Sequence, residues 1–391
     1  MAKLFLHRTL LIIYSITLIS IMGVASLTPA FPGIARALHI TPKEVGLLIT
    51  AFTLPGIFLT PVLGILADRY GRKRILVPSL FLFAIAGTAC FFIHNFEWMV
   101  VLRFIQGSGA AALGSINVTL IGDIFKGNDR PTAMGYNASV LSVGTASYPI
   151  IGGALATIGW YYPFLLPSLA VLVGMLVVYA LHNPEPKNEQ TLKDYFKTTL
   201  ATLHNKNIYG LFLLSLLTFV ILYGPYLTYL PFLIEETFSQ PPYIIGIIMS
   251  FASFASLSIS SQIGRLTRRF SEKKLIVTSC FLYFFSMVSI PFVTEVWQLI
   301  FPAILFGFAQ GTNLPSLQSL LAGLAPMNQR AAIMSVNGMI FRLGQTLGPL
   351  IIVPVYAIWG LAGAYDLGGI VAVMMLFIAI FLLKTVERKT E

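Results

Sequence analysis

The residues with the clearest chemical potential form a charged turn between two long apolar runs. The turn reads Gly64-Ile65-Leu66-Ala67-Asp68-Arg69-Tyr70-Gly71-Arg72-Lys73-Arg74. A carboxylate at Asp68 would end the first run, where it could face the positive end of a neighbouring helix. Arg72 would reach Asp123, at the end of a later run, through a charge-assisted hydrogen bond. These residues suit a latch that opens and closes. The alternative is a basic loop that only sets orientation in a membrane.

Two arginines, Arg103 and Arg342, lie inside apolar runs. An arginine at mid-membrane costs at least about 2.5–3.5 kcal/mol on insertion scales, so it normally faces a cavity or a partner. Such a guanidinium could bind an anionic substrate group or tune a proton site. It could also be satisfied by backbone carbonyls and helix ends, and both alternatives stay open for Arg342.

Acidic residues are missing from the apolar runs. No Asp or Glu lies in the middle of any run, and the five histidines lie at edges or in loops. A proton-coupled carrier usually has an intramembrane carboxylate, and a carrier for cationic drugs would use one as a counter-charge. Neutral or weakly acidic substrates therefore fit better than cations. Proton coupling stays open through Asp123, Glu97 or the substrate itself.

Soluble chemistry has no support in the sequence. There is no phosphate-binding Gly-x-x-x-x-Gly-Lys-Ser/Thr loop, so ATP hydrolysis is not expected. The histidines are scattered, and Cys90 and Cys280 both fall inside apolar runs, which argues against a metal site or a disulfide. We expect a protein that is not an enzyme and carries no cofactor or metal.

Twelve apolar runs would position these residues. Hydrophobic residues make up 57% of the chain and charged residues 10%, with a mean hydropathy of +0.83. A soluble domain is roughly a quarter charged. Each run is about 20 residues long, enough to cross a ~30 Å hydrocarbon core as a helix. The predicted spans are 9–31, 46–66, 75–94, 98–120, 133–155, 161–181, 208–231, 243–264, 275–293, 298–320, 332–356 and 362–384.

The net charge of +10 follows the same pattern. Nearly all loop cations fall on one side of the predicted spans, and only Arg36 and Lys43 fall on the other. By the positive-inside rule, both termini lie in the cytoplasm. The basic charge therefore reflects topology, and no nucleic-acid partner is indicated. We interpret the first run as an uncleaved span, because it is long and lacks a signal-peptide cleavage site.

The chain contains an internal repeat, in which the sequence pattern of the first half recurs in the second half. A weaker copy of the charged turn, Gly264–Lys274, follows 200 positions later, and other positions recur at the same offset: Asn137, Gly144 and Pro149 as Asn337, Gly344 and Pro349. The polar stretch 182–207 is a predicted cytoplasmic linker between a six-helix bundle at 1–181 and another at 208–391. Arg268 replaces Asp68 in the second copy, so a second latch should be missing. Duplicated halves that rock around a shared site are typical of secondary transporters.

These motifs resemble the major facilitator superfamily across essentially the whole chain. The charged turn resembles that superfamily's motif between spans two and three, and Arg103-Phe104-Ile105-Gln106-Gly107 resembles its span-four motif. The span-five spacing resembles the twelve-span drug–proton antiporter branch, through Gly135, Gly144, Pro149, Gly152 and Gly153. Tyr148 departs from that motif, which has glycine there. The second half keeps glycine at the equivalent position, Gly348, in a segment that also contains Gly344 and Pro349.

The resemblance implies an all-α membrane protein whose two six-helix bundles alternate access to a central cavity. Asp68 would pair with the start of span eleven near Ala332, which would close the cytoplasmic side and favour the outward-facing state. The glycines and prolines would let helices approach and bend, with ordinary packing as the alternative. The candidate cavity residues are Asn117, Asn137, Tyr223, Tyr226, Gln310, Asn313, Asn337 and Gln345. Aromatic stripes such as the span-seven tyrosines are more often packing than a binding site.

We therefore expect a monomeric plasma-membrane transporter of small molecules. The leading hypothesis is export of lipophilic neutral or weakly acidic compounds by proton antiport. A second hypothesis is uptake or facilitated diffusion of a small organic anion, with Arg103 and Arg342 as ligands. A third, a membrane receptor or scaffold, would predict long extramembrane domains, for which the sequence gives no support.

Overall fold

The computed structural model describes residues 5–126, 129–181, 206–324 and 330–383, and every regular element in these ranges is a helix. The chain forms two compact units. The first comprises Met1–Leu192 with Ile234–Ser250, and the second comprises Lys193–Leu233 with Phe251–Glu391. The units follow the two repeats except at Ile234–Ser250, which groups with the first unit. The predicted linker at 182–207 lies outside the described residues, apart from its last two positions.

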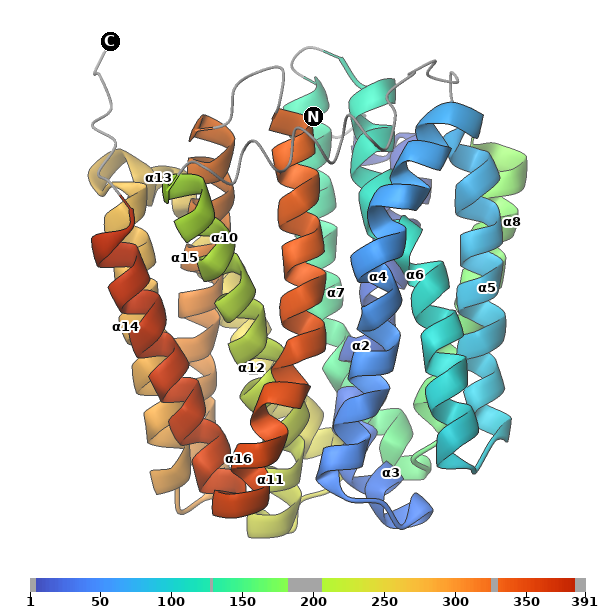
Figure 1. Cartoon of the computed structure of the whole chain (residues 1–391). Helices are drawn as coiled ribbons and strands as arrows, with labels where there is room; N and C mark the ends of the chain where they lie inside the picture. The colour runs from blue at the N-terminus through green and yellow to red at the C-terminus, as the bar shows by residue number, and fades with distance from the viewer. Residues whose placement is uncertain (1–4, 127–128, 182–205, 325–329, 384–391) are drawn as a thin grey trace. The chain divides into compact units, whose positions relative to one another are not determined.

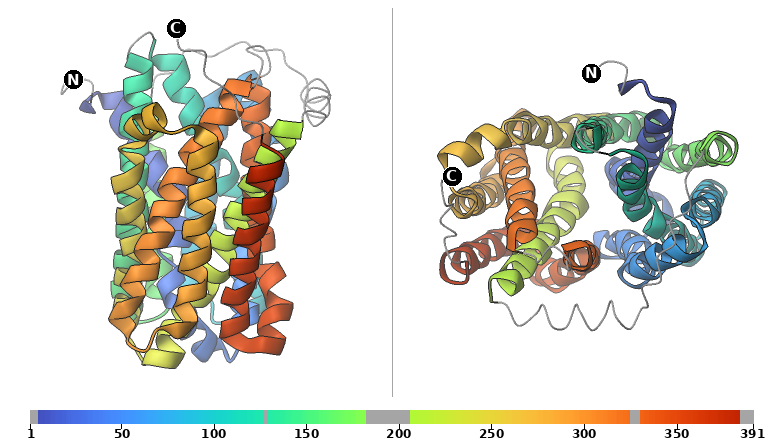
Figure 2. Two further views of the ribbon diagram at one scale, coloured as in Figure 1. Left: turned by 90° about the vertical axis from the view of Figure 1, so that its left-hand side faces the viewer. Right: turned by 90° about the horizontal axis from the view of Figure 1, so that it is seen from above.

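Long helices that run side by side dominate the first unit (Figures 1 and 2). Helix α4 packs on α6, α5 on both α6 and α8, and α2 on α7. The helices are α2 (Arg8–Ala25), α3 (Phe31–Leu38), α4 (Pro42–Tyr70), α5 (Arg72–Phe92), α6 (Phe96–Ile124), α7 (Asp129–Ile158) and α8 (Leu169–Ala180).

Local sequence sets the ends of the helices that carry the charged turn. Helix α4 begins with a capping box, in which the Thr41 amide donates to Glu44 Oε2 at 2.8 Å. It ends at Gly71, whose φ of 101° is a conformation that glycine adopts far more readily than other residues. Asp68 therefore lies in the last turn of α4, and Arg72 is the first residue of α5.

The second unit contains helices of the same kind, α10 (Lys206–Ile221), α13 (Ile263–Arg269), α14 (Glu272–Ser289), α15 (Ile300–Leu324) and α16 (Arg330–Phe381), while α11 (Leu230–Phe238) and α12 (Pro242–Ser260) cross the boundary between the units. Between α10 and α11 a π-helical segment, η3 (Leu222–Tyr229), contains Pro225. Proline lacks the amide hydrogen that an α-helix needs, and a wider turn is one way to absorb this. The Thr228 hydroxyl donates to the Tyr223 carbonyl at 2.6 Å within this segment.

All twelve predicted runs are helical, which confirms the predicted all-α membrane fold. Within the described residues, ten helical segments are long and apolar enough to cross a membrane, and the run predicted at 298–320 is not among these ten. The last of them, Ile333–Phe381, contains both predicted spans eleven and twelve. The two spans meet at Gly360, where φ 65° and ψ −156° interrupt α16. The run predicted at 298–320 forms α15, a 25-residue helix that carries the polar side chains of Gln310, Thr312 and Asn313.

Glycines bring α2 and α7 together in the first unit. A methyl group placed on Gly144 would lie 2.6 Å from Ile21, and one on Gly152 would overlap the Ser26 carbonyl group. Further along, a methyl group on Gly153 would lie 2.5 Å from the Pro242 carbonyl oxygen, on α12. Hydrogen in place of a side chain therefore lets these backbones approach.

The same kind of seam joins α16 to α10 and η3 in the second unit. A methyl group on Gly348 would lie 2.9 Å from the Gly224 nitrogen, and one on Gly344 would lie 2.5 Å from the Leu216 carbonyl oxygen. The kink-forming Pro349 lies next to Gly348 within this helix. Gly135 is different, because a methyl group there would meet no described atom within 4 Å. Packing therefore does not account for the glycine at 135.

We predict that Gly152→Ala lowers the free energy of unfolding by about 1–3 kcal/mol, because the added carbon overlaps the α2 backbone. Gly135→Ala is the matched control and should leave stability unchanged or slightly raised. Thermal denaturation of both purified variants in detergent measures the difference. Equal melting temperatures would show that the α2–α7 approach does not need glycine.

Candidate functional site

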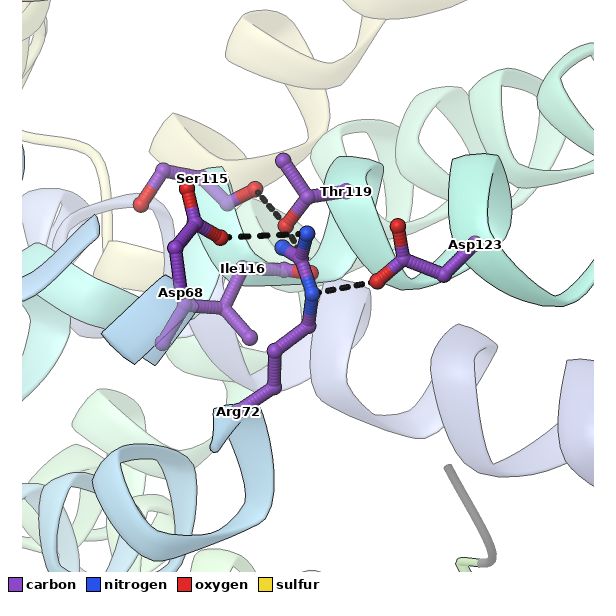
Figure 3. Close-up of polar contacts among 6 residues, drawn as sticks. All are labelled: Asp68, Arg72, Ser115, Ile116, Thr119 and Asp123. Carbon is purple, nitrogen blue, oxygen red and sulfur yellow. Dashed lines mark hydrogen bonds and ion pairs between the residues drawn. The ribbon is translucent and has the colours of Figure 1, made fainter. Parts of the chain in front are cut away.

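The charged turn forms an ion-pair cluster at the junction of α4, α5 and α6 (Figure 3). Arg72 Nη2 lies 3.1 Å from Asp68 Oδ1, and Arg72 Nε pairs with Asp123 Oδ2. The predicted contact between Arg72 and Asp123 is therefore present. Figure 3 shows the guanidinium lying between the two carboxylates, beside the last turns of α6.

Burial makes this cluster stronger than an ordinary surface pair. The Arg72 side chain is 7% exposed, against 35% for Asp68 and 24% for Asp123. A cation that loses its hydration depends on its partners, whereas the more exposed Asp68 keeps contact with solvent. One cation faces two carboxylates, so Asp68 has spare capacity to accept a hydrogen bond. The partner that the sequence predicts for it, near Ala332, belongs to the other unit, and this pairing stays a prediction.

Gly64 and Gly71 have different places in the turn. Gly71 ends α4 with its positive φ, and its amide donates to the Ala67 carbonyl at 3.1 Å. A side chain at 71 would strain the backbone that places Arg72 beside Asp68. A methyl group on Gly64 would meet no described atom within 4 Å, so no described contact explains the glycine there.

A lysine in each copy of the turn caps a helix, which sequence analysis missed. Lys73 Nζ donates to the carbonyls of Val178 and Leu181, at the end of α8. Lys273 Nζ donates to the carbonyls of Ile380 and Leu383, at the end of α16. An ammonium group satisfies these free carbonyls and complements the helix dipole. The two lysines occupy equivalent positions in the two copies of the charged turn, and this equivalence was the signal in the sequence that could have predicted both caps.

The ion-pair cluster, by contrast, is not repeated. Arg268 occupies the position of Asp68 in the second copy and is exposed on α13. The ion pairs of Arg72 with Asp68 and Asp123 belong to the first copy. The helix caps are thus common to both halves, and the carboxylate–arginine cluster distinguishes one half from the other.

Arg103 is held entirely inside the first unit. Its side chain is 1% exposed, Nε donates to the Leu48 carbonyl at 3.3 Å, and Nη1 donates to Gln106 Oε1 at 2.7 Å. The guanidinium also lies 4.3 Å from the centre of the Phe52 ring. A backbone carbonyl, an amide and an aromatic face therefore stabilise this cation, and the predicted role of Arg103 in coupling or anion binding stays a prediction.

Arg342 lies in a more open setting. Its Nη1 donates to Gln345 Oε1 at 3.2 Å, and the side chain is only half-buried on α16. Tyr223, on η3, interacts electrostatically with this guanidinium. Phe219 of α10 packs against Phe341, with ring centroids 4.6 Å apart. The structure thus brings together three of the predicted residues, Arg342, Gln345 and Tyr223, beside two aromatic rings.

Three of the predicted asparagines belong to buried polar clusters. In the first unit Thr17 donates to Asn137 Oδ1 at 2.6 Å and accepts a hydrogen bond from Asn117. In the second unit Asn313 donates to Thr218 at 2.7 Å. Both threonines project from the first helix of their unit, and sequence analysis overlooked them. Each cluster links helices in the membrane interior, where polar groups need protein partners.

Asn337 and Tyr226 are also buried, and Gln310 is half-buried. Asn337 is 1% exposed on α16. Tyr226 stacks on Phe306, with centroids 4.1 Å apart, and the Tyr283 hydroxyl donates to Gln310 Oε1. Tyr226 and Gln310 therefore contribute to packing among η3, α14 and α15, which is the alternative that the tyrosine stripe raised.

The described carboxylates lie near the ends of helical segments. Asp68, Asp123 and Asp129 lie at the ends of α4, α6 and the start of α7. Asp366 follows shortly after the break at Gly360 and is exposed. Within the described residues, no carboxylate lies near Arg103 or Arg342 in an ion pair.

Comparison with known proteins gives this arrangement a family. The model described as Major Facilitator Superfamily matches residues 13–294 and 233–391, which together include most of the chain. The chain belongs to the major facilitator superfamily. It is a multi-pass membrane protein and a secondary transporter, and its relatives are transporters of small molecules rather than enzymes.

Two curated relatives are exporters or resistance proteins by name. The bacillibactin exporter of Bacillus subtilis (strain 168) is 25% identical over 90% of this chain and 89% of its own length. The class C tetracycline resistance protein of Escherichia coli is 24% identical over 90% of each chain. The crystal structure of the nucleoside transporter NupG has a TM-score of 0.80 and 16% identity, over 96% of this chain and all of that one. This last similarity supports the fold.

We predict that Arg72→Leu destabilises this superfamily member by about 1–3 kcal/mol, because it leaves two neighbouring carboxylates without their cation. Asp68→Asn should cost less, since Asp68 is the more exposed partner. Arg69→Leu removes an exposed cation from the same turn and serves as the control. Melting temperatures that fall equally in Arg72→Leu and Arg69→Leu would contradict a role for the buried pair.

The two intramembrane arginines should also differ in their contribution to stability. Arg103→Gln removes a buried group with two hydrogen bonds and a ring contact, and we expect a loss of about 1–3 kcal/mol. Arg342→Gln should change stability by less than about 0.5 kcal/mol, because that side chain is half-buried and makes one long hydrogen bond. Thermal denaturation of the two variants side by side tests this order, and the reverse order would refute it.

Proposed function

We propose that this transporter exports lipophilic neutral or weakly acidic small molecules by proton antiport. The observation that carries the proposal is similarity over about nine-tenths of the chain to proteins named as an exporter and a resistance protein. The glycine–proline pattern of span five, which resembles the drug–proton antiporter branch, supports the same direction of transport.

The charge distribution supports the substrate class. Two arginines lie within the spans, whereas the described carboxylates lie near helix ends. A cationic substrate would meet repulsion without a counter-charge. A neutral compound needs no counter-charge, and a weak acid gains one from arginine. Asp123 and Glu97 are the candidate groups for carrying the coupled proton.

Alternating access would use the latch cluster as its cytoplasmic closure. Arg72 holds Asp68 and Asp123 together, and the proposed contact of Asp68 with span eleven would close the path from the cytoplasm. Breaking it would favour the inward-facing state. The cations of the charged turns support a cytoplasmic location for this side and for both termini, and we propose a monomer in the plasma membrane.

Uptake or facilitated diffusion of a small organic anion is the second candidate function. The half-buried Arg342 favours it, because a guanidinium without an ion pair among the described residues suits an anionic ligand. The two candidates differ in the direction of movement and in the need for a proton gradient.

The test measures accumulation of matched cationic, neutral and weak-acid probes in efflux-deficient cells that express the protein. We expect lower accumulation of the neutral and acidic probes, and loss of this difference when a protonophore collapses the gradient. Cells expressing Asp123→Asn report whether that carboxylate carries the proton. Raised accumulation of the acidic probe, insensitive to the protonophore, would replace export with the organic-anion candidate.

A further inference from the structure

The protein contains the same arginine–glutamine pair twice, in two different environments. Arg103 donates to Gln106 at 2.7 Å on α6, and Arg342 donates to Gln345 at 3.2 Å on α16. In both pairs the residues are three positions apart, so one helix face holds the guanidinium and the amide together. The glutamine orients the arginine in each case.

The surroundings of the two guanidinium groups decide what each can do. Arg103 is 1% exposed, its Nε and Nη1 donate to the Leu48 carbonyl and to Gln106, its guanidinium lies over the Phe52 ring, and its Nη2 is buried without a hydrogen-bond partner. Arg342 keeps part of its surface open and makes no ion pair with any described residue. A guanidinium carries five N–H donors in a planar fork that matches a carboxylate. At Arg342 the amide of Gln345 accepts one of them.

Aromatic side chains from α10, η3 and α16 pack together at the residue that precedes Arg342, within the same unit. Phe219 and Phe341 lie 4.6 Å apart, and Phe219 and Tyr223 lie 6.1 Å apart, between ring centroids. The close approach of α16 to α10 and η3, at Gly344 and Gly348, holds together the segments that carry these rings and Arg342. A guanidinium, a phenol and two apolar rings are therefore carried by three helical segments that pack on one another.

We infer that Arg342, Gln345 and Tyr223 bind the carboxylate of an aromatic acid, whose ring packs against Phe219 and Phe341. The guanidinium pairs with the carboxylate, Gln345 holds the fork in position, and the Tyr223 hydroxyl donates a further hydrogen bond. A cation has no complementary group here, and a neutral amide loses the charge-assisted bonds. The inference rests on the proposed function for the weakly acidic class of substrate, and it names the site that selects that class.

Equilibrium binding to the full-length protein in lipid nanodiscs tests this site. The probes are 1-naphthaleneacetate and its primary amide, which share the ring system and differ in charge. We expect the wild-type protein to bind the acid at least about tenfold more tightly than the amide, and Arg342→Gln to abolish this preference. Arg342→Lys should keep part of the preference, because it retains the charge and loses the fork. Tyr223→Phe should weaken binding of the acid about threefold or more.

Arg268→Gln is the matched control, since it removes the same charge from the exposed surface of α13. It should bind both probes like the wild-type protein. Equal binding of acid and amide by the wild-type protein would overturn the inference. So would a preference that survives in Arg342→Gln, or a loss of both probes in that variant together with a lower melting temperature.

The measurement separates this site from the proposed export. Binding at equilibrium needs no gradient and has no direction. A preference for the acid that depends on Arg342, in a protein whose cells show no protonophore-sensitive export, would support the site and refute antiport. Export of the neutral probe, by a protein that shows no preference for the acid, would support antiport and refute the site.

Discussion

The structure depends on one constraint, which is that polar groups within a membrane must find their partners inside the protein. The helices satisfy their own backbones, and hydroxyl groups return to the carbonyls one turn earlier, as Ser26 does to Met22 at 2.7 Å. Amides and cations need partners on neighbouring helices. Arg103 finds them at Leu48 and Gln106. Buried polar contacts between closely packed helices thus follow from one property of the bilayer, which offers polar groups no hydrogen-bonding partners.

That constraint also separates structural polar groups from those available to a ligand. Arg103 is enclosed, so its charge stabilises the contact between α4 and α6. Arg342 carries the same charge in a half-buried position on α16, where a partner from outside the chain can complete its hydrogen bonding. A transporter needs such incomplete sites, because a substrate must be bound and then released. The sequence places both residues inside apolar runs, and burial in the structure distinguishes their surroundings.

Duplication explains what the two halves share, and divergence explains what one half does alone. Lys73 and Lys273 both cap the final helix of their half, and each repeat contains a glycine seam. These features stabilise the bundles and recur. The cluster of Asp68, Arg72 and Asp123 occurs in the first copy, where two carboxylates share one cation. The two halves therefore differ in the ionic contacts of their charged turns while they share their helix caps.

The sequence by itself determined the spans, the repeat and the family resemblance, because hydropathy and motif spacing can be read along the chain. The contact of Arg72 with Asp123 was predicted from their opposite charges at the ends of two spans, and the packing of α5 on α6 brings them together. The tertiary structure decided which polar residues are enclosed. Tyr226 stacks on Phe306 and Gln310 accepts a hydrogen bond from Tyr283, contacts that spacing did not predict, and Thr17 was missed because a threonine in an apolar run has no distinctive pattern. Burial depends on which helices become neighbours, and spacing along one helix does not contain that information.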